Sequence, residues 1–308
     1  MRRVLVTGAA GFFGANAVRA FVEQGGWEVH GLDRPGVDRA RLDAVAPGAK
    51  VHEVDLEDAR AVRALVDEVR PELGVHLAWY VVPGKFWTAP ENIDLLNASF
   101  GLCRALAEGG CKRIVTAGTC FEYDVTTGAE RLGEDAPVRP TFLYSATKHA
   151  MFEVLTHATK GWGVSYAHLR FFYQYGPWEA PSRLVSDVMS ALVRGEEAQV
   201  TMGEQVRDFL HIADVGRAIA AASTSELTGA VNVGSGEGIA VRDLVAAAAR
   251  ALNLESRVHY GARPSRPDDP PFVVADATRL RSVGWTPRLS LAAGMSDTAA
   301  WYRSRRPA

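Results

Sequence analysis

The chain has 308 residues, of which 47% are hydrophobic, so it can bury a large core. Its formal net charge is −2 and its basic residues do not cluster, which argues against nucleic acid as the main partner. Three cysteines, at positions 103, 111 and 120, form no close pair, which is typical of a reducing compartment and predicts no zinc site. We find neither a signal peptide nor a run of roughly 18 apolar residues, so we expect a cytoplasmic protein that does not enter a membrane.

Short apolar runs alternate with helical patterns over the first 172 residues. The expected buried strands are 3–8, 27–33, 50–55, 73–79, 113–118 and 164–171. Between them, the segments 12–24, 57–70 and 92–110 carry apolar residues at three- and four-residue spacing, as amphipathic helices do. This alternation predicts an α/β fold: a doubly wound parallel sheet of the Rossmann type, covered by helices on both faces.

The pattern becomes less regular after residue 172. Loops rich in proline and charge appear, including "YGPWEAP" and "RPSRPDDPP". Segment 209–222 again looks like a strand followed by a helix, and segment 230–236 looks like a strand. We therefore expect a dinucleotide-binding domain from 1–172 plus about 209–237. The remaining residues, 173–208 and 238–308, would form a smaller substrate-binding lobe.

A glycine-rich segment follows the first expected strand. In "VLVTGAAGFFG", Gly8, Gly11 and Gly14 lead into the first helix, with Phe12 and Phe13 between the last two glycines. Such glycines let the backbone turn tightly and approach a pyrophosphate, which the helix N-terminus attracts. Because the segment lies between a strand and a helix, it predicts a dinucleotide site that includes both phenylalanines.

Acidic residues follow the next two strands. Asp33 lies 19 residues after Gly14, where a carboxylate accepts hydrogen bonds from an adenosine ribose and repels a 2′-phosphate. NAD is therefore favoured, although Arg34 beside it leaves NADP open. Asp55 and Leu56 follow the third strand, and Asp55 either contacts the adenine or caps the next helix.

Tyr144 and Lys148 stand four residues apart at an expected helix start, "LYSATK". Residues at this spacing share a helix face whatever their role. Taken alone, the pair is compatible with ordinary helix surface as well as with proton transfer.

Motifs along nearly the whole chain resemble those of the extended short-chain dehydrogenase/reductase family of nucleotide-sugar epimerases, dehydratases and ketoreductases. They are "TGAAGFFG", "HLAW", "AGTCFEY", "YSATK", "LRFFYQYGP", "RDFLHIAD" and "VNVGSG", in the family's order. The resemblance implies an NAD-dependent oxidoreductase whose partner is a nucleoside-diphosphate sugar. It also implies a homodimer, formed through helices near 91–108 and 145–160.

The resemblance assigns a catalytic role to three residues. Tyr144 matches the proton donor or acceptor, and Lys148 matches the lysine that binds the nicotinamide ribose and lowers the tyrosine pKa. Thr119, four residues before Tyr123, matches the hydroxyl residue that supports the substrate oxygen. The chemistry agrees, because hydride transfer to a ketone creates an alkoxide that needs a proton and hydrogen-bond donors. A nearby ammonium favours the phenolate form of a tyrosine.

Further cofactor contacts are implied after the fourth strand. Leu77 and Ala78 match residues that line the cofactor site. Trp79 and Tyr80 replace smaller residues, so they either crowd the nicotinamide side or belong to the core. Asn97 either serves the active-site framework or only packs.

The substrate contacts are implied on the second half of the chain. Arg207 matches an arginine that binds the substrate diphosphate, and a guanidinium suits phosphate oxygens because it binds them in pairs. Arg183 and Arg266 are candidates for the same patch, with surface ion pairing as their alternative. Tyr173 stands where the family has an asparagine that helps to bind the diphosphate. We expect Tyr173 to lie at the substrate, but without the contact that the asparagine makes.

The residues after Thr119 restrict the reaction. Related dehydratases carry Asp-Glu there, whereas this chain has Cys120 and Phe121, so we expect no loss of water from the sugar. We interpret Cys120 as a packed residue and Glu122 as a hydrogen-bonded loop carboxylate. The favoured function is a 4-ketoreductase for a nucleoside-diphosphate 4-keto-6-deoxysugar, and the alternative is a 4-epimerase that retains NAD. A non-catalytic dinucleotide sensor is disfavoured because Tyr144 and Lys148 are both present.

Overall fold

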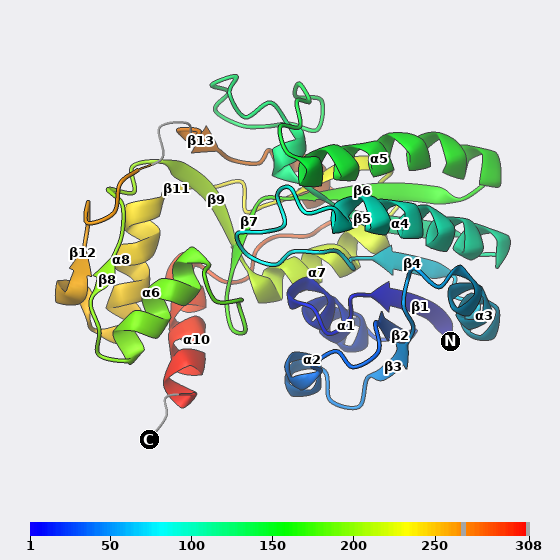
Figure 1. The fold of residues 1–308 in the computed structure, drawn as a ribbon, viewed down its shortest axis with the longest axis horizontal. Coiled ribbons are helices and arrows are strands. Elements are labelled where there is room, and N and C mark those ends of the chain that lie inside the picture. Colours follow the sequence, from blue (N-terminus) through cyan, green and yellow to red (C-terminus); the bar gives the residue numbers. More distant parts are fainter. Residues whose placement is uncertain (266–268, 306–308) are drawn as a thin grey trace.

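The computed structural model describes residues 1–265 and 269–305. A seven-stranded sheet runs through its larger part in the order β10-β6-β5-β4-β1-β2-β3, and every pairing is parallel (Figure 1). Its strands are β1 (Arg2–Thr7), β2 (Trp27–Asp33), β3 (Lys50–Glu53), β4 (Leu73–His76), β5 (Arg113–Thr119), β6 (Ser165–Phe171) and β10 (Gly229–Val233). The predicted fold class is confirmed.

Helices cover both faces of this sheet because its strands alternate between two cores. On β1, Val4 and Val6 join the core under one layer of helices, while Leu5 joins the core on the opposite face. The first layer is α1 (Phe12–Gln24), α2 (Ala40–Val45) and α7 (Ile212–Ser223). The second layer is α3 (Ala59–Val69), α4 (Glu91–Glu108) and α5 (Leu143–Trp162).

A smaller group of elements lies beside the carboxyl ends of these strands, at the left of Figure 1. In its main sheet β9 (Val206–His211) pairs with β7 (Tyr173–Tyr175), β11 (Gly238–Ala240) and β13 (Phe272–Val273). Around it are α6 (Leu184–Val193), α8 (Val241–Leu252), α10 (Leu291–Ser304) and the pair β8 (Ala198–Gln199) with β12 (Val258–His259). The short elements are η1 (Cys120–Glu122), η2 (Glu255–Arg257) and α9 (Thr278–Arg281).

The chain leaves the large sheet after β6 and returns to it later. It passes through β7, α6 and β9, then forms α7 against α1 and adds β10 at the sheet edge beside β6. Two strands are shorter than expected, because β3 ends at Glu53 and β4 ends at His76. Leu77, Ala78 and Trp79 therefore belong to the loop that follows β4. Within the described residues, every helix is too short or too polar to span a bilayer.

Candidate active site

The glycine-rich turn packs closely against the loop after β4. Gly8 has a φ of 67°, and a Cβ on it would lie 2.9 Å from the Cα of Ala78. A Cβ on Gly14 would overlap the carbonyl oxygen of Gly8. The N-cap of helix α1 is Gly11, which has no side chain to cap it, so the first N–H groups of the helix remain available for an anion. This bare turn fits the pyrophosphate of a dinucleotide.

Asp33 lies at the end of β2, directly beside this turn. Its Oδ2 accepts a hydrogen bond from the Ala10 N–H at 2.6 Å. Burial raises the pKa of Asp33, and the Ala10 bond and the charge of Arg34 act in the opposite direction. A carboxylate at this place fits an adenosine ribose. Arg34 itself is exposed.

Both phenylalanines at the start of α1 are partly buried against the core beneath α1 and α7. The ring centre of Phe13 is 4.5 Å from that of Phe171. Arg41, which the sequence did not suggest, donates to the carbonyl oxygen of Ala10 at 2.9 Å and to that of Trp178 at 3.1 Å. It therefore joins the glycine-rich turn to the segment after β7.

Asp55 and Asp58, which both follow β3, make different hydrogen bonds. Asp55 is exposed, and its Oδ1 accepts a hydrogen bond from the Glu57 N–H at 3.0 Å. The N-cap of α3 is Asp58, which accepts from two N–H groups of that helix. The alternative that Asp55 caps the helix is therefore wrong, because the helix begins too late. Leu56 is buried in the core under α3 and α4.

A buried chain of hydrogen bonds fixes the loop after β4. Oγ1 of Thr7 accepts from the N–H groups of Leu77 at 3.1 Å and Ala78 at 3.2 Å. His76 is 1% exposed and lies 2.7 Å from both Thr7 Oγ1 and Ser99 Oγ. Burial lowers the pKa of His76 to about 3, so this ring is neutral at physiological pH. Leu77 and Ala78 are thereby held beside Gly8, as a cofactor-lining role requires.

Asn97 is exposed on α4, so the alternative that it only packs is wrong, and its role in the active-site framework stays a prediction. The buried asparagine is Asn92, whose amide donates to the carbonyl oxygens of Phe86 and Ala89 at 2.8 Å. Its Oδ1 accepts from the indole N–H of Trp79 at 2.8 Å. The half-buried Trp79 ring lies 3.5 Å from the Lys148 ammonium, and the indole is thus part of the site.

Helix α5 places Tyr144 in its first turn and Lys148 one turn later. Burial raises the pKa of Tyr144, and Cys120 and Glu122 raise it further, while the nearby Thr119 hydroxyl lowers it. Thr119 therefore lies close to Tyr144. Lys148 is 2% exposed, and burial lowers its pKa well below the ordinary value. In the protein alone, burial outweighs the expected lowering of the tyrosine pKa.

Aromatic rings surround Tyr144, and we call Phe86, Trp87, Phe121, Phe142 and Tyr173 the aromatic band. The Phe86 ring centre is 4.9 Å from that of Tyr144. Trp87 and Phe121 are also 4.9 Å apart, and the Trp87 carbonyl oxygen accepts from the Tyr144 N–H at 3.1 Å. The sequence does not predict these contacts, because the band combines the loop after β4 with η1, the start of α5 and β7.

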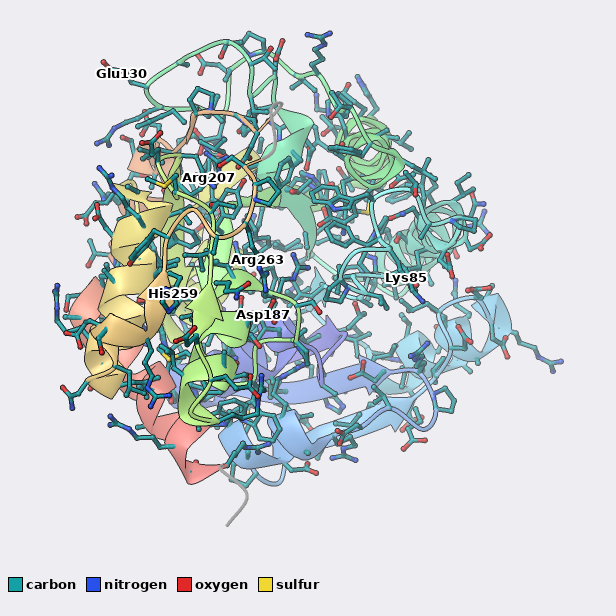
Figure 2. The ribbon with its side chains drawn as sticks, turned by 60° about the vertical axis from the view of Figure 1, so that its left-hand side comes forward. Lys85, Glu130, Asp187, Arg207, His259 and Arg263 are labelled. Atoms are coloured by element: carbon teal, nitrogen blue, oxygen red, sulfur yellow. The ribbon has the colours of Figure 1, made fainter. Side chains whose placement is uncertain are left out.

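Two of the predicted arginines lie at the band. The Arg183 guanidinium is 5.2 Å from the Phe86 ring centre, and its charge acts on Tyr144. Arg207, labelled in Figure 2, is 3% exposed and donates to Asp269 at 2.6 Å. Its guanidinium is 5.6 Å from the Tyr173 ring centre. Arg266 lies outside the described residues.

The residues after Thr119 are poorly suited to proton transfer with a substrate. Cys120 is 1% exposed, and burial raises the pKa of its thiol to about 12. Glu122 is fully buried and bonded on both oxygens. In the described part of the chain, no three or more His, Cys, Asp or Glu side chains are grouped as metal ligands would be.

Known proteins share this architecture over the full length of the chain. A family described as "NAD dependent epimerase/dehydratase family" matches residues 4–234. UDP-glucose 4-epimerase from Lactobacillus helveticus is 26% identical, over 98% of this chain and 97% of the relative. dTDP-glucose 4,6-dehydratase from Streptomyces griseus is 29% identical, over 98% and 94%. The structure of Thermus thermophilus UDP-glucose 4-epimerase in complex with NAD superposes with a TM-score of 0.84 at 28% identity, covering 98% of this chain and 99% of that one.

Proposed function

The chain belongs to the NAD dependent epimerase/dehydratase family, and we propose that it is a nucleotide-sugar 4-epimerase that keeps its NAD through the catalytic cycle. The observation that carries this proposal is that Thr119, at the carboxyl end of β5, lies close to Tyr144, with Lys148 one turn farther along α5. The full-length similarity to UDP-glucose 4-epimerases supports it.

The bound cofactor would accept and return the hydride at C4 of the sugar. Gly8, Gly11 and Gly14 would hold its pyrophosphate and Asp33 its adenosine ribose, while Lys148 would bind the nicotinamide ribose. Tyr144 takes the proton of the C4 hydroxyl and later gives it back, and Thr119 donates a hydrogen bond to the C4 oxygen. Arg207 would exchange Asp269 for the substrate diphosphate, with Arg183 near the sugar.

Loss of water from the sugar is not part of this proposal. It requires proton removal at C5 and protonation of the leaving C6 hydroxyl, each by a group within hydrogen-bond reach. Beside Thr119 the chain offers a buried thiol and a phenyl ring. A 4-epimerase needs neither group, because C4 oxidation and its reversal use only Tyr144, Thr119 and the cofactor.

One observation favours a second candidate, a reductase of a nucleoside-diphosphate 4-keto-6-deoxysugar. The aromatic band lines the surroundings of Tyr144 with apolar rings. A 6-deoxysugar carries a methyl group near its reacting C4, and such rings accommodate a methyl group better than a hydroxymethyl group or a carboxylate.

Mass spectrometry of the nucleotide released by denaturing the purified protein distinguishes the two candidates. Stoichiometric NAD, with interconversion of a nucleotide 4-epimer pair without added cofactor, is the expected result. A site that exchanges its cofactor, with NADH consumed by a nucleotide 4-keto-6-deoxysugar, would replace the epimerase with the reductase. Accumulation of a 4-keto-6-deoxy product from a nucleoside-diphosphate glucose would exclude both.

A further inference from the structure

The side chain of Trp79 is fixed at both of its ends. At the backbone end it follows Ala78, whose N–H donates to Oγ1 of Thr7 at 3.2 Å. At the far edge of the ring, the indole N–H donates to Oδ1 of Asn92 at 2.8 Å. The ring is therefore held between the end of β1 and the start of α4, where Asn92 lies.

Asn92 is itself a rigid support for the indole. It is 0% exposed, and its amide donates to the carbonyl oxygens of Phe86 and Ala89, both at 2.8 Å. Because the NH₂ group makes both of these bonds, the amide oxygen is the atom that faces the indole N–H of Trp79. The hydrogen bond between Trp79 and Asn92 thus fixes the plane of the ring.

One face of this fixed ring lies against the ammonium of Lys148. Nζ is 3.5 Å from the ring centre of Trp79, well within the distance of about 6 Å over which an aromatic face attracts a cation. Lys148 is 2% exposed, and this attraction is strongest where both groups are withdrawn from water. The carboxylate of Glu122 on η1 pairs instead with His168 and Arg170. Within the described residues, the ammonium is thus held by a ring face and by no ion pair.

A lysine benefits from such a contact because its ammonium has no preferred direction of its own. The four-carbon stem is flexible and the three N–H donors rotate, unlike the planar fork of an arginine. A ring face attracts the charge without supplying a hydrogen-bond acceptor, so donors of Lys148 stay available for the acceptors of a ligand. In the proposed function, those acceptors are the hydroxyl groups of the nicotinamide ribose.

We propose that Trp79 is a positioning residue whose ring face holds the Lys148 ammonium at the nicotinamide ribose of NAD. The part that Lys148 plays there rests on the proposed function. Trp79 also packs against the core under α3 and α4. A test must therefore separate the contact with the ammonium from ordinary packing.

Calorimetric titration with two nucleotides makes this separation. ADP carries the adenosine and the pyrophosphate of NAD but lacks the nicotinamide ribose, so it does not reach Lys148. Trp79→Leu should weaken NAD binding about tenfold and leave ADP binding unchanged. Trp79→Phe keeps a ring face and should restore most of the NAD affinity. The control is Trp162→Leu, the same exchange at the end of α5, where the side chain is 38% exposed, and it should change neither affinity.

A double-mutant cycle shows whether the effect passes through Lys148. In a Lys148→Met background, Trp79→Leu should cause no further loss of NAD affinity, because the charge that the ring holds is gone. An equal loss in both backgrounds would overturn the proposal, and so would an equal loss for NAD and ADP. A folded Trp79→Leu with wild-type NAD affinity would overturn it as well.

Should Trp79→Leu not fold, the wild-type protein still provides a test. The chain has five lysines, so the ¹Hε signals of labelled lysine can be separated by NMR, and Lys148→Arg identifies that of Lys148. Protons over an aromatic face are shifted upfield, so this signal should lie upfield of the other four, and a signal among them would overturn the proposal. NAD and ADP affinities that change as expected, in a protein that converts no nucleotide sugar, would reject only the proposed function.

Discussion

The environment of Tyr144 and Lys148 opposes the charged forms that hydride chemistry needs. Burial raises the pKa of the phenol and lowers that of the ammonium. A phenolate forms in this site only when a further positive charge arrives, which an oxidised nicotinamide provides. In the proposed mechanism, proton transfer by Tyr144 is therefore coupled to occupation of the cofactor site.

Tyr144→Phe should reduce turnover at least about a hundredfold, because general acid–base catalysis at C4 is lost. Cofactor affinity, measured by fluorescence titration, should change little because the ring and its packing remain. The matched control is Tyr260→Phe on the smaller lobe, where the side chain is 40% exposed. Wild-type turnover in Tyr144→Phe would remove this residue from the mechanism.

His76 should make folding stability depend on pH. Its pKa is lowered from 6.5 to about 3, so an unfolded chain binds a proton at pH 5 and the folded chain does not. Stability from this residue is complete above pH 6.5 and declines as the pH falls toward 3. Between pH 7.5 and 5, the free energy of unfolding of the wild type, measured with urea, should therefore fall by about 2 kcal/mol more than that of His76→Gln. Equal losses would show that the ring is not buried in its neutral form.

Among the secondary-structure elements, α3 shows how one residue decides where a helix begins. Asp58 accepts from the N–H groups of Arg60 and Ala61, at 3.1 and 3.0 Å. Asp55, three residues earlier, bonds only to the turn before the helix. Asp58 therefore has the structural role at the start of α3, whereas Asp55 stays available for the proposed contact with the adenine.

Exchange of each acid for alanine tests this division. Asp58→Ala should lower the free energy of unfolding by about 1 kcal/mol, the usual value of an N-cap, with unchanged NAD affinity. Asp55→Ala should weaken NAD binding and leave stability nearly unchanged. Calorimetry with and without NAD measures both quantities, and a reversed pattern would exchange the roles of the two residues.

Sequence patterns predicted those parts of the site whose residues are neighbours in the chain. The glycine-rich turn, Asp33 and the Tyr144–Lys148 pair each lie within one strand-to-helix connection or one helical turn. The sequence does not single out the buried Asn92, whose side chain lies about 140° around α4 from that of Asn97 because the two are five residues apart. The aromatic band and the contacts of Arg41 join segments far apart in the sequence, so only the folded chain reveals them.

At the scale of the whole molecule, the late return of the chain depends on the close packing of α7 against α1. Gly216 of α7 lies against the backbone of Asn16, and a Cβ at this glycine would overlap the Asn16 carbonyl oxygen. Ile219 and Ala222 of the same helix are fully buried in the core that α1 shares. A side chain at position 216 would therefore push the two helices apart.

Gly216→Ala should lower the free energy of unfolding by about 1–3 kcal/mol, as overpacking of a tight core does. Gly101→Ala is the control, because this helical glycine of α4 is exposed and a Cβ there would meet nothing within 4 Å. That substitution should raise stability by roughly 0.5–1 kcal/mol. Urea unfolding measures both free energies. An unchanged free energy of unfolding in Gly216→Ala would mean that α1 and α7 are less tightly packed than the structure shows.

The position of β10 at the sheet edge has a consequence for biosynthesis. When β6 leaves the ribosome, the strand that pairs with its outer edge has not been made, and the face of α1 that α7 covers is still open to water. About 60 residues separate these strands. At about 5–20 residues per second, the nascent chain therefore exposes an unpaired, apolar strand edge for about 3–12 seconds. In this interval the open edge of β6 can pair with a strand of another chain, so a chaperone would protect the protein most at this stage of translation.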